Sequence, residues 1–472
     1  MSAREDRKPD LRRIVMELLL ERGDYPTRRF GAAVQAAGLD ARDRSLARQL
    51  LGGVLRRAVQ LDAIYEPYCN KRVTDDVVRW ALRLGTLQLF FLSNVPEHAA
   101  VHATIQAARP FLRERTGFTH AVLRNLQRKS KQEEPFSTEF SRRRLTVGRR
   151  SWWFDRPVFS DPEKFPIDYH SQQQSFPVGL VRRWFDELGE EAALARMEAL
   201  SATPPIWLRV QTAKVSRDEV LATLTEAGAE VEAVEHPRFL LMRRAGRELT
   251  ALPGYAEGHW AVQDLTSFEA VEMAQPKAGE KVLDLCAAPG GKSFAVAELT
   301  EGGAEILACD TDADRLARLA PEAERLGHSI ATQVVDGEAF AYPEGAVDLL
   351  ILDVPCTNTG VLHKRPEARA RFHKDELHRA TTVQNLIRKA VQKTYLGSDG
   401  PRPRVLWTTC SLEPEENEEM AARLAKQARY RLVEERRFEP DGLRAGGYAA
   451  ILEPEPLSEA PAHERQEKEE EA

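Results

Sequence analysis

The sequence predicts a multidomain protein in which an all-α N-terminal domain is followed by a small α+β module and a doubly wound α/β domain. Three observations predict these parts. Apolar residues recur at helical spacing up to about residue 130, helical and extended patterns alternate over 171–260, and buried strand-like runs separated by helical patterns fill 261–453. A chain of 472 residues is also too long for a single hydrophobic core.

The first domain, 1–132, contains amphipathic helical patterns such as "RSLARQLLGGVLRRAVQLDAIYEPYC" and "DDVVRWALRLGTLQLFFL". Asp40 and Thr74 precede two of these patterns. They are predicted N-caps, because their side-chain oxygens can accept hydrogen bonds from the free N–H groups of a first helical turn.

The periodicity fails in 133–170, which is predicted to be a linker or an insertion. Trp152 and Trp153 lie there beside several arginines, and two interpretations stay open: the indoles stack on RNA bases, or they form a small separate core. In 171–260 the order is helical, extended, helical and extended, which is typical of a small α+β module.

The third domain, 261–453, is predicted to be a parallel sheet covered by helices, because apolar runs such as "KVLDLCAA", "AEILACD", "AVDLLILDVP" and "RVLWTTCS" alternate mostly with helical patterns. Functional residues are then expected at the carboxyl ends of the strands. Pro321 should interrupt one of the helices. The acidic tail, 454–472, is predicted to be disordered.

Composition excludes several classes of protein. Hydrophobic residues make up 42% and charged residues 30% of the chain, no apolar run reaches about 18 residues, and the charged N-terminus has no apolar segment of a secretory signal. We therefore expect a cytoplasmic protein that does not enter a membrane. The five cysteines form no C-x-x-C pair, which argues against a disulfide framework or a thiolate metal site.

The net charge of −6 is unevenly distributed. Residues 453–472 hold eight acidic and two basic residues, so the remainder of the chain is balanced, and "SRRRLTVGRR" at 141–150 contains five arginines. Such clusters are either solvated faces or contacts to nucleic acid, and the sequence leaves both interpretations open.

The loop "DLCAAPGGKS", 284–293, indicates a cofactor site, because its glycines let the backbone approach a ligand and a helix start follows. A phosphate-binding P-loop would need glycine where Cys286 stands, and the dinucleotide pattern G-x-G-x-x-G is absent. Asp310, Asp336 and Asp353 end three successive predicted strands. A glycine loop beside such a series favours an adenosine-type cofactor, with S-adenosylmethionine as the leading candidate.

Cys356 in "DVPCTNTG" and Cys410 in "TTCSLEPEEN" each follow a predicted strand. A thiolate that adds to C6 of a pyrimidine makes C5 nucleophilic enough to attack a sulfonium methyl group, and a second thiol could assist release of the adduct. Asp353 could hydrogen-bond or protonate the base at N3. The alternative is that both cysteines are small buried hydrophobic residues, as Cys69 and Cys309 are expected to be.

The motifs "DLCAAPGGKS", "DVPCTNTGVL" and "TTCSLEPEEN", in this order, resemble those of the RNA 5-methylcytosine methyltransferases of the NOL/NOP/Sun family. The resemblance covers about 171–452 and implies a Rossmann-like methyltransferase domain that uses S-adenosylmethionine. It implies Cys410 as the nucleophile, Cys356 as the residue that aids release, and Asp353 as a further catalytic residue. The implied cofactor contacts are Cys286, Ala287, Ala288, Pro289, Gly290, Gly291 and Lys292, with Asp310, Asp336 and Asp353.

The N-terminal domain resembles the NusB-like RNA-binding domain through "GVLRRAVQLDAIYEPY" and "LRLGTLQLFFLSNVPEHAAVHATIQAAR". The combination implies RNA as the partner, small-subunit (16S) ribosomal RNA in particular, and a monomeric enzyme. A DNA cytosine methyltransferase is disfavoured, since the Glu-Asn-Val motif is absent. An RNA-binding ribosome-assembly scaffold with little or no methyltransferase turnover is the alternative from another class.

Overall fold

The computed structural model describes residues 10–21, 26–93, 95–337, 343, 345–372, 374–397 and 402–455. The chain forms two compact units. The first comprises Met1–Ala202 and Leu362–Glu376, and the second comprises Thr203–Val361 and Leu377–Ala472. The acidic tail lies outside the described residues, except for Pro454 and Glu455 at its start.

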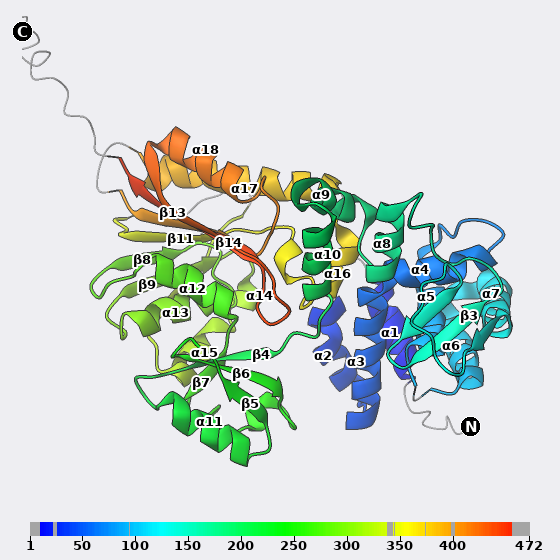
Figure 1. Ribbon diagram of the computed structural model, residues 1–472. Coiled ribbons are helices and arrows are strands. Elements are labelled where there is room, and N and C mark those ends of the chain that lie inside the picture. Colours follow the sequence, from blue (N-terminus) through cyan, green and yellow to red (C-terminus); the bar gives the residue numbers. More distant parts are fainter. Residues whose placement is uncertain are drawn as a thin grey trace, which may run out of the picture. The chain divides into compact units, whose positions relative to one another are not determined.

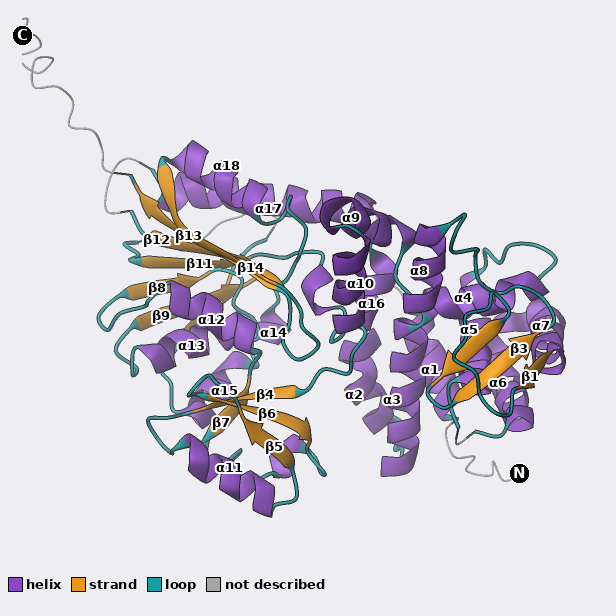
Figure 2. Ribbon diagram, viewed as in Figure 1, coloured by secondary structure: helices purple, strands orange, loops and turns teal. Residues whose placement is uncertain are grey.

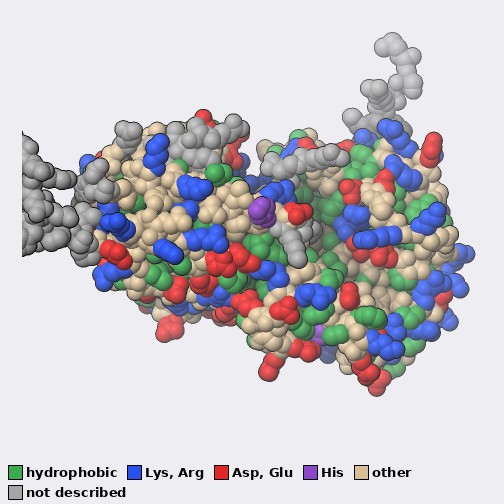
Figure 3. All heavy atoms as spheres, turned by 90° about the horizontal axis from the view of Figure 1, so that it is seen from above, with side chains coloured by type: hydrophobic (Ala, Val, Ile, Leu, Met, Phe, Trp, Pro, Cys, Tyr) green, Lys and Arg blue, Asp and Glu red, His purple; other side chains and the backbone are tan. Residues whose placement is uncertain are grey.

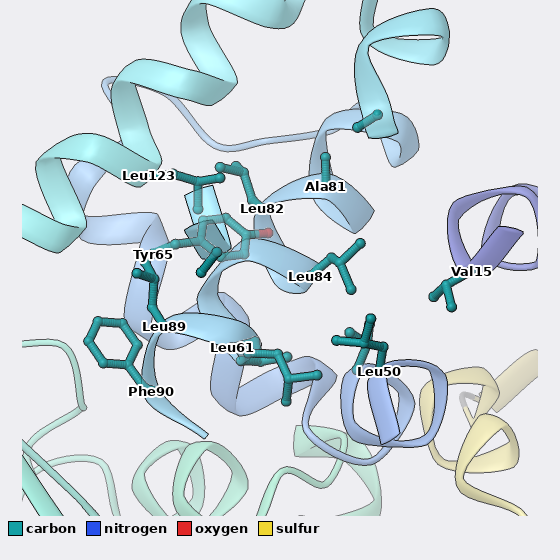
Figure 4. Packing of buried hydrophobic residues seen from close by; sticks show 14 of the residues in the cluster. Val15, Leu50, Leu61, Tyr65, Ala81, Leu82, Leu84, Leu89, Phe90 and Leu123 are labelled. Carbon is teal, nitrogen blue, oxygen red and sulfur yellow. The ribbon is translucent and has the colours of Figure 1, made fainter. Parts of the chain in front are cut away.

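The first unit begins with helices packed around one hydrophobic core (Figure 1). They are α1 (Leu11–Leu20), α2 (Pro26–Ala36), α3 (Ala41–Arg56), α4 (Ala58–Tyr65), α5 (Asp76–Phe90), α6 (Glu97–Leu112) and α7 (Thr116–Lys129). Figure 4 shows side chains of α1, α3, α4, α5 and α7 pointing into this core, among them Val15, Leu50, Leu61, Leu84 and Leu123. The predicted all-α domain is confirmed.

Helix α5 is central because it is buried on almost every side from Ala81 to Phe90. Gly85 allows α7 to approach, since a Cβ atom there would lie 2.5 Å from a methyl carbon of Leu123. Asp40 caps α3 as predicted, accepting a hydrogen bond from the Asp43 N–H at 2.8 Å. The predicted cap of α5 is wrong by one residue: Asp75, not Thr74, accepts from the first turn.

Residues 133–170, predicted as a linker or insertion, are not a linker. They contain β2 (Arg144–Val147), β3 (Arg150–Phe154) and the start of α8 (Pro166–Gln174), and with β1 (Ser130–Gln132) they make an antiparallel sheet in the order β1-β3-β2. Trp152 is buried in the core of the helical domain and Trp153 is exposed. Short strands with charged outer residues hide this fold from a search for apolar periodicity.

Three helices group with the first unit: α8, α9 (Val178–Leu188) and α10 (Glu190–Ala199). Of these, α9 and α10 lie within 171–260, the range predicted as the α+β module. The short helix α16 (Pro366–Arg371) joins them, although its sequence follows the predicted fourth strand of the α/β domain. The buried Arg369 guanidinium explains this placement. It donates to the carbonyls of Arg56, Gln174 and Leu200, at the ends of α3, α8 and α10, where helix dipoles favour a cation.

The second unit contains two sheets (Figure 2). The smaller is antiparallel, in the order β5 (Glu230–Ala233), β6 (Phe239–Arg244), β4 (Ile206–Val210) and β7 (Trp260–Val262), with α11 (Arg217–Glu226). The larger has the order β10-β9-β8-β11-β12-β14-β13. Its strands are β8 (Lys281–Asp284), β9 (Glu305–Asp310), β10 (Ala331–Val334), β11 (Leu349–Asp353), β12 (Arg404–Thr409), β13 (Tyr430–Phe438) and β14 (Gly447–Pro454).

The five strands from β10 to β12 in this order are parallel, and β14 and β13 add an antiparallel edge. The helices are α12 (Leu265–Met273), α13 (Gly291–Leu299), α14 (Ala313–Leu316), α15 (Leu319–Leu326), α17 (Lys374–Tyr395) and α18 (Glu418–Ala428). Pro321 lies in the first turn of α15, after the predicted interruption. Successive β11 residues enter two cores: Leu350 packs with α17 and α18, and Ile351 with α12 and α13. The doubly wound α/β prediction is therefore confirmed.

Candidate active site

The two cysteines meet beyond the carboxyl ends of β11 and β12. These strands pair in parallel with Asp353 opposite Thr408, so the loops that follow them start side by side. The Cys356 and Cys410 sulfur atoms lie 3.2 Å apart as thiols and are not joined in a disulfide. The Cys410 sulfur also lies 3.2 Å from the Asn358 side-chain oxygen. The structure thus places the two thiols side by side.

Backbone hydrogen bonds fix the distance between the two loops. The Gly360 N–H donates to the Cys410 carbonyl at 2.9 Å, and the Gly446 N–H donates to the Gly360 carbonyl at 2.8 Å. A Cβ atom on Gly360 would lie 2.4 Å from the Gly446 oxygen. Glycine at 360 is therefore required for three chain segments to approach this closely.

Glu416 is buried beneath the cysteine loops. It was not among the predicted site residues, although it lies within the motif "TTCSLEPEEN". Its carboxylate accepts from the Thr357 N–H at 2.9 Å and from the Gln384 side-chain amide at 3.1 Å. The hydroxyls of Thr357 and Ser411 also donate to it. Burial raises the pKa of Glu416 to about 7, against the opposing effect of these donors.

The environment of Cys356 keeps its thiol neutral. The hydrogen bond with Cys410 raises the pKa of Cys356 well above its ordinary value, and burial and the charge of Glu416 act in the same direction. A neutral Cys356 thiol can donate a hydrogen bond to a Cys410 thiolate.

Lys292 and Asp353 form an ion pair beside the thiols. The Lys292 ammonium lies 2.6 Å from the Asp353 carboxylate and donates to the Ser267 hydroxyl at 3.3 Å. Burial lowers the pKa of Lys292, but the charge and hydrogen bond of Asp353, together with the charge of Asp284, act in the opposite direction, and the pKa is raised overall. A negative charge on Cys410 contributes to the same rise. The ammonium is therefore close enough to stabilise a Cys410 thiolate.

The glycine loop connects β8 to α13 in a shape that suits a ligand. The Asp310 carboxylate accepts from the Ala288 N–H and from the Asp312 N–H, both at 2.9 Å. Gly290 has φ +108°, and a Cβ atom there would meet Phe294 and Leu319 within 3 Å. A Cβ atom on Gly291 would lie 3.6 Å from the Gln263 side-chain nitrogen, which is ordinary van der Waals contact, so the start of α13 is not crowded. A cofactor that contacts backbone and a strand-end carboxylate fits this loop.

Two further carboxylates lie near the loop. Asp284 is fully buried and accepts from the Ser293 hydroxyl at 2.8 Å, and burial raises its pKa to about 7. Burial, with Asp284 and its acidic neighbours, also raises the pKa of Cys286 well above its ordinary value, which makes Cys286 a poor nucleophile. Asp336 is exposed after β10, one strand beyond Asp310. The structure therefore groups Lys292, Asp353, Cys356 and Cys410, and places Asp336 at a separate strand end.

A buried arginine ties the smaller sheet to this loop. Arg209 on β4 donates to Gln263, whose side-chain amide donates to the Gly291 carbonyl at 2.8 Å. The same guanidinium lies 2.7 Å from the carboxylate of Glu298, near the other end of α13. Sequence reasoning missed Arg209 and Gln263, because neither belongs to a motif and only the fold brings them to α13.

Comparison with known proteins identifies the family of each part. Residues 271–464 match the family model described as 16S rRNA methyltransferase RsmB/F, residues 11–128 match the NusB family, and residues 176–245 match the ferredoxin-like domain of the RsmF/B-like methyltransferases. The chain is 31% identical to ribosomal RNA small subunit methyltransferase B of Klebsiella pneumoniae subsp. pneumoniae, over 82% of both chains. It is 30% identical to the Cronobacter sakazakii protein of that name, over 80% of this chain and 81% of the relative.

Solved structures share the fold. The crystal structure of PH0851 matches with a TM-score of 0.71 and 23% identity, covering 94% of this chain and 98% of that one. The structure of NSun6 from Pyrococcus horikoshii with SFG matches with a TM-score of 0.51 and 20% identity, covering 59% of this chain and 98% of that one.

The fold, the site and the family matches define an S-adenosylmethionine-dependent RNA (cytosine-C5) methyltransferase with a NusB-like N-terminal domain. More particularly, the chain belongs to the RsmB/F family of 16S rRNA methyltransferases. The resemblance found in the motifs is confirmed. Among the described residues, no helix has the length and apolar character needed to span a bilayer.

Proposed function

We propose that this chain methylates C5 of a cytosine in 16S ribosomal RNA, with Cys410 as the nucleophile and Cys356 as the group that assists release. The observation that carries the proposal is the pair of sulfur atoms 3.2 Å apart, beside the Lys292–Asp353 ion pair. Support for the RNA substrate comes from the relatives, which are named as small-subunit ribosomal RNA methyltransferases.

The first step is addition of the Cys410 thiolate to C6 of the cytosine. The C6–S bond forms as the C5–C6 double bond gives up its electron pair to the ring. Lys292 stabilises the thiolate before attack, because its ammonium is held in place by Asp353. The Cys410 thiol gives its proton to water before attack, and N3 takes up a proton from water as the adduct forms. The Asp353 carboxylate accepts the resulting N3–H hydrogen bond and stabilises the adduct.

When bound, S-adenosylmethionine would supply the electrophilic methyl group for C5, with S-adenosylhomocysteine as its product. The residues that would hold it are Cys286, Ala287, Ala288, Pro289, Gly290, Gly291 and Lys292, with Asp310, Asp336 and Asp353. Asp310 is suited to hydroxyl groups, because its carboxylate is fixed by two backbone N–H groups and each oxygen retains a lone pair.

Release needs loss of the C5 proton and cleavage of the C6–S bond. The C5 proton passes to water, the electron pair of the C5–H bond re-forms the C5–C6 double bond, and sulfur departs as the Cys410 thiolate. N3 returns its proton to water, so the product is neutral 5-methylcytosine. The neutral Cys356 thiol donates a hydrogen bond to that sulfur as negative charge develops on it. Cys356 thus acts in the last step, after the methyl group has been transferred.

The test is methylation of deproteinised 16S ribosomal RNA by wild type and by Cys410→Ser, with 5-methylcytosine measured by mass spectrometry of nucleosides. We expect one modified cytosine per RNA from wild type and none from the variant. Wild-type protein that binds S-adenosylmethionine and the RNA but forms no 5-methylcytosine would contradict the proposal and leave an assembly scaffold as the function.

A further inference from the structure

The sheet β1-β3-β2 lies in a part of the chain that the family models leave uncovered, since one model ends at 128 and the next begins at 176. One face of this sheet is buried. Trp152 and Phe154 pack edge to face against Phe90 of α5, with ring centroids 5.6 and 5.4 Å away. Because side chains alternate along a strand, Trp153 points to the opposite face, where it is 38% exposed.

Trp153 is the centre of a row that crosses all three strands. It pairs with Lys131 on β1 and with Arg144 on β2, and residues directly opposite in antiparallel strands share a face. The Arg144 guanidinium lies 5.4 Å from the Trp153 ring centroid. Two hydrogen bonds to Glu133, at 2.8 and 3.0 Å, anchor Arg144, so the exposed indole is held in place before any ligand arrives.

Positive charge surrounds the row. Residues 128–156 contain nine Lys and Arg against four Asp and Glu. Arg143 is exposed beside β2, and Arg149 is exposed at the tip of the hairpin that joins β2 to β3. This local excess of positive charge favours a polyanion. Over the face of the molecule seen in Figure 3, Lys and Arg side chains are instead mixed with Asp and Glu.

We propose that this face, the row Lys131, Trp153 and Arg144 with the hairpin tip, binds a single-stranded segment of the RNA substrate. The inference rests on the proposed function for the identity of that RNA. Trp153 stacks on an unpaired base, while Lys131 and Arg149 contact phosphates. Single-stranded RNA combines exposed π faces with a polyanionic backbone, and the bases of a duplex are closed to an indole.

Binding can be measured separately from catalysis by fluorescence anisotropy with a labelled 12-nucleotide uridine oligomer, using a Cys410→Ala chain that forms no adduct. Adding Trp153→Ala should raise the Kd of the oligomer about tenfold, since stacking of one base on an aromatic ring contributes roughly that factor to affinity. Trp153→Phe should restore most of the lost affinity. Lys131→Ala should reduce the slope of log Kd against log salt by about 0.7, whereas Trp153→Ala should leave the slope unchanged.

Phe165→Ala is the matched control, because Phe165 is 57% exposed in the same unit but lies outside the sheet. It should leave affinity unchanged. In the otherwise wild-type enzyme, Trp153→Ala should raise KM for ribosomal RNA without changing kcat. The proposal would be overturned if Trp153→Ala bound the oligomer as tightly as the parent chain. It would also be overturned if the substitution weakened binding of a duplex of the same length by the same factor. Either result would favour a protein as the partner of this face. Normal oligomer binding without 5-methylcytosine would instead contradict the proposed function alone.

Discussion

The Lys292 ammonium lies 2.6 Å from the Asp353 carboxylate, at the point where the cofactor loop and the end of β11 meet. Lys292 thereby connects the glycine loop, proposed to hold the cofactor, with the end of β11, where Asp353 is proposed to contact the base. A charge on Cys410 raises the pKa of the same ammonium, so the ion pair and the proposed nucleophile influence each other electrostatically.

Replacing Lys292 should lower the reactivity of the Cys410 thiol. In Lys292→Met the Cys410 thiolate loses a buried cation, and we expect its alkylation by iodoacetamide at pH 7.5 to slow about tenfold, as followed by mass spectrometry of the Cys410 peptide. Lys281→Met is the control, because Lys281 starts β8 at the far end from the site. Equal alkylation rates in Lys292→Met and wild type would show that Lys292 does not act on the thiol.

Gly360→Ala should displace the Cys356 loop. The new methyl group would lie 2.4 Å from the Gly446 oxygen, which forces the backbone to move. We expect a loss of about 1–3 kcal/mol in the free energy of unfolding and at least a tenfold fall in methylation. Gly397→Ala should change neither, since no atom lies within 4 Å of its Cβ position. Full activity of Gly360→Ala would contradict the proposed rigidity of the loops.

Glu416 should make stability depend on pH. Its folded-state pKa of about 7 is above the ordinary value of 4.5, so its contribution to stability is complete below pH 4.5 and is lost as pH rises through 7. The free energy of unfolding of wild type minus that of Glu416→Gln should therefore fall by about 3 kcal/mol between pH 4.5 and 8. Urea denaturation at several pH values measures this difference, and Asp284 titrates equally in both proteins. A difference independent of pH would show that folding does not shift the pKa of Glu416, and a difference that rises with pH would show that folding lowers it.

Gln263 should position the cofactor loop. Gln263→Glu keeps an acceptor for Arg209 but replaces the amide N–H that donates to the Gly291 carbonyl with a carboxylate oxygen. Two oxygens then face each other, and the hydrogen bond is lost. We expect the Kd of S-adenosylmethionine, measured by calorimetry, to rise about tenfold, with kcat at saturating cofactor nearly unchanged. Gln333→Glu, on the exposed strand β10, is the control. Loss of kcat at unchanged Kd would place Gln263 in the chemistry instead of in positioning.

The sequence predicted the parts of the fold that depend on strong local patterns. The buried strands ending at Asp310 and Asp353 were visible because parallel strands covered on both faces are apolar throughout. The strands at 144–154 were not, because strands of four and five residues are too short to show a clear alternating pattern. The placement of Arg369 depends on three helix ends that are far apart in the sequence.

The candidate site was predictable where residues follow strands, since parallel strands end at one edge of a sheet. Cys356 and Cys410 could therefore be expected near each other from their positions alone. The burial of Glu416 could not be predicted, because an acidic residue in "SLEPEEN" is typical of an exposed turn. Only the folded loops enclose its carboxylate. Arg209 and Gln263 reach the cofactor loop through packing between two sheets, which leaves no local signal.

The two thiols are proposed to act in different steps, and trapping the RNA adduct separates their roles. Wild type, Cys356→Ala and Cys410→Ala are incubated with S-adenosylmethionine and deproteinised 16S ribosomal RNA, denatured, and digested, and the peptide joined to a nucleotide is identified by mass spectrometry. A stable adduct that accumulates in Cys356→Ala, is attached at Cys410, and is absent from Cys410→Ala is the predicted result. An adduct attached at Cys356, or one that forms without Cys410, would contradict the account.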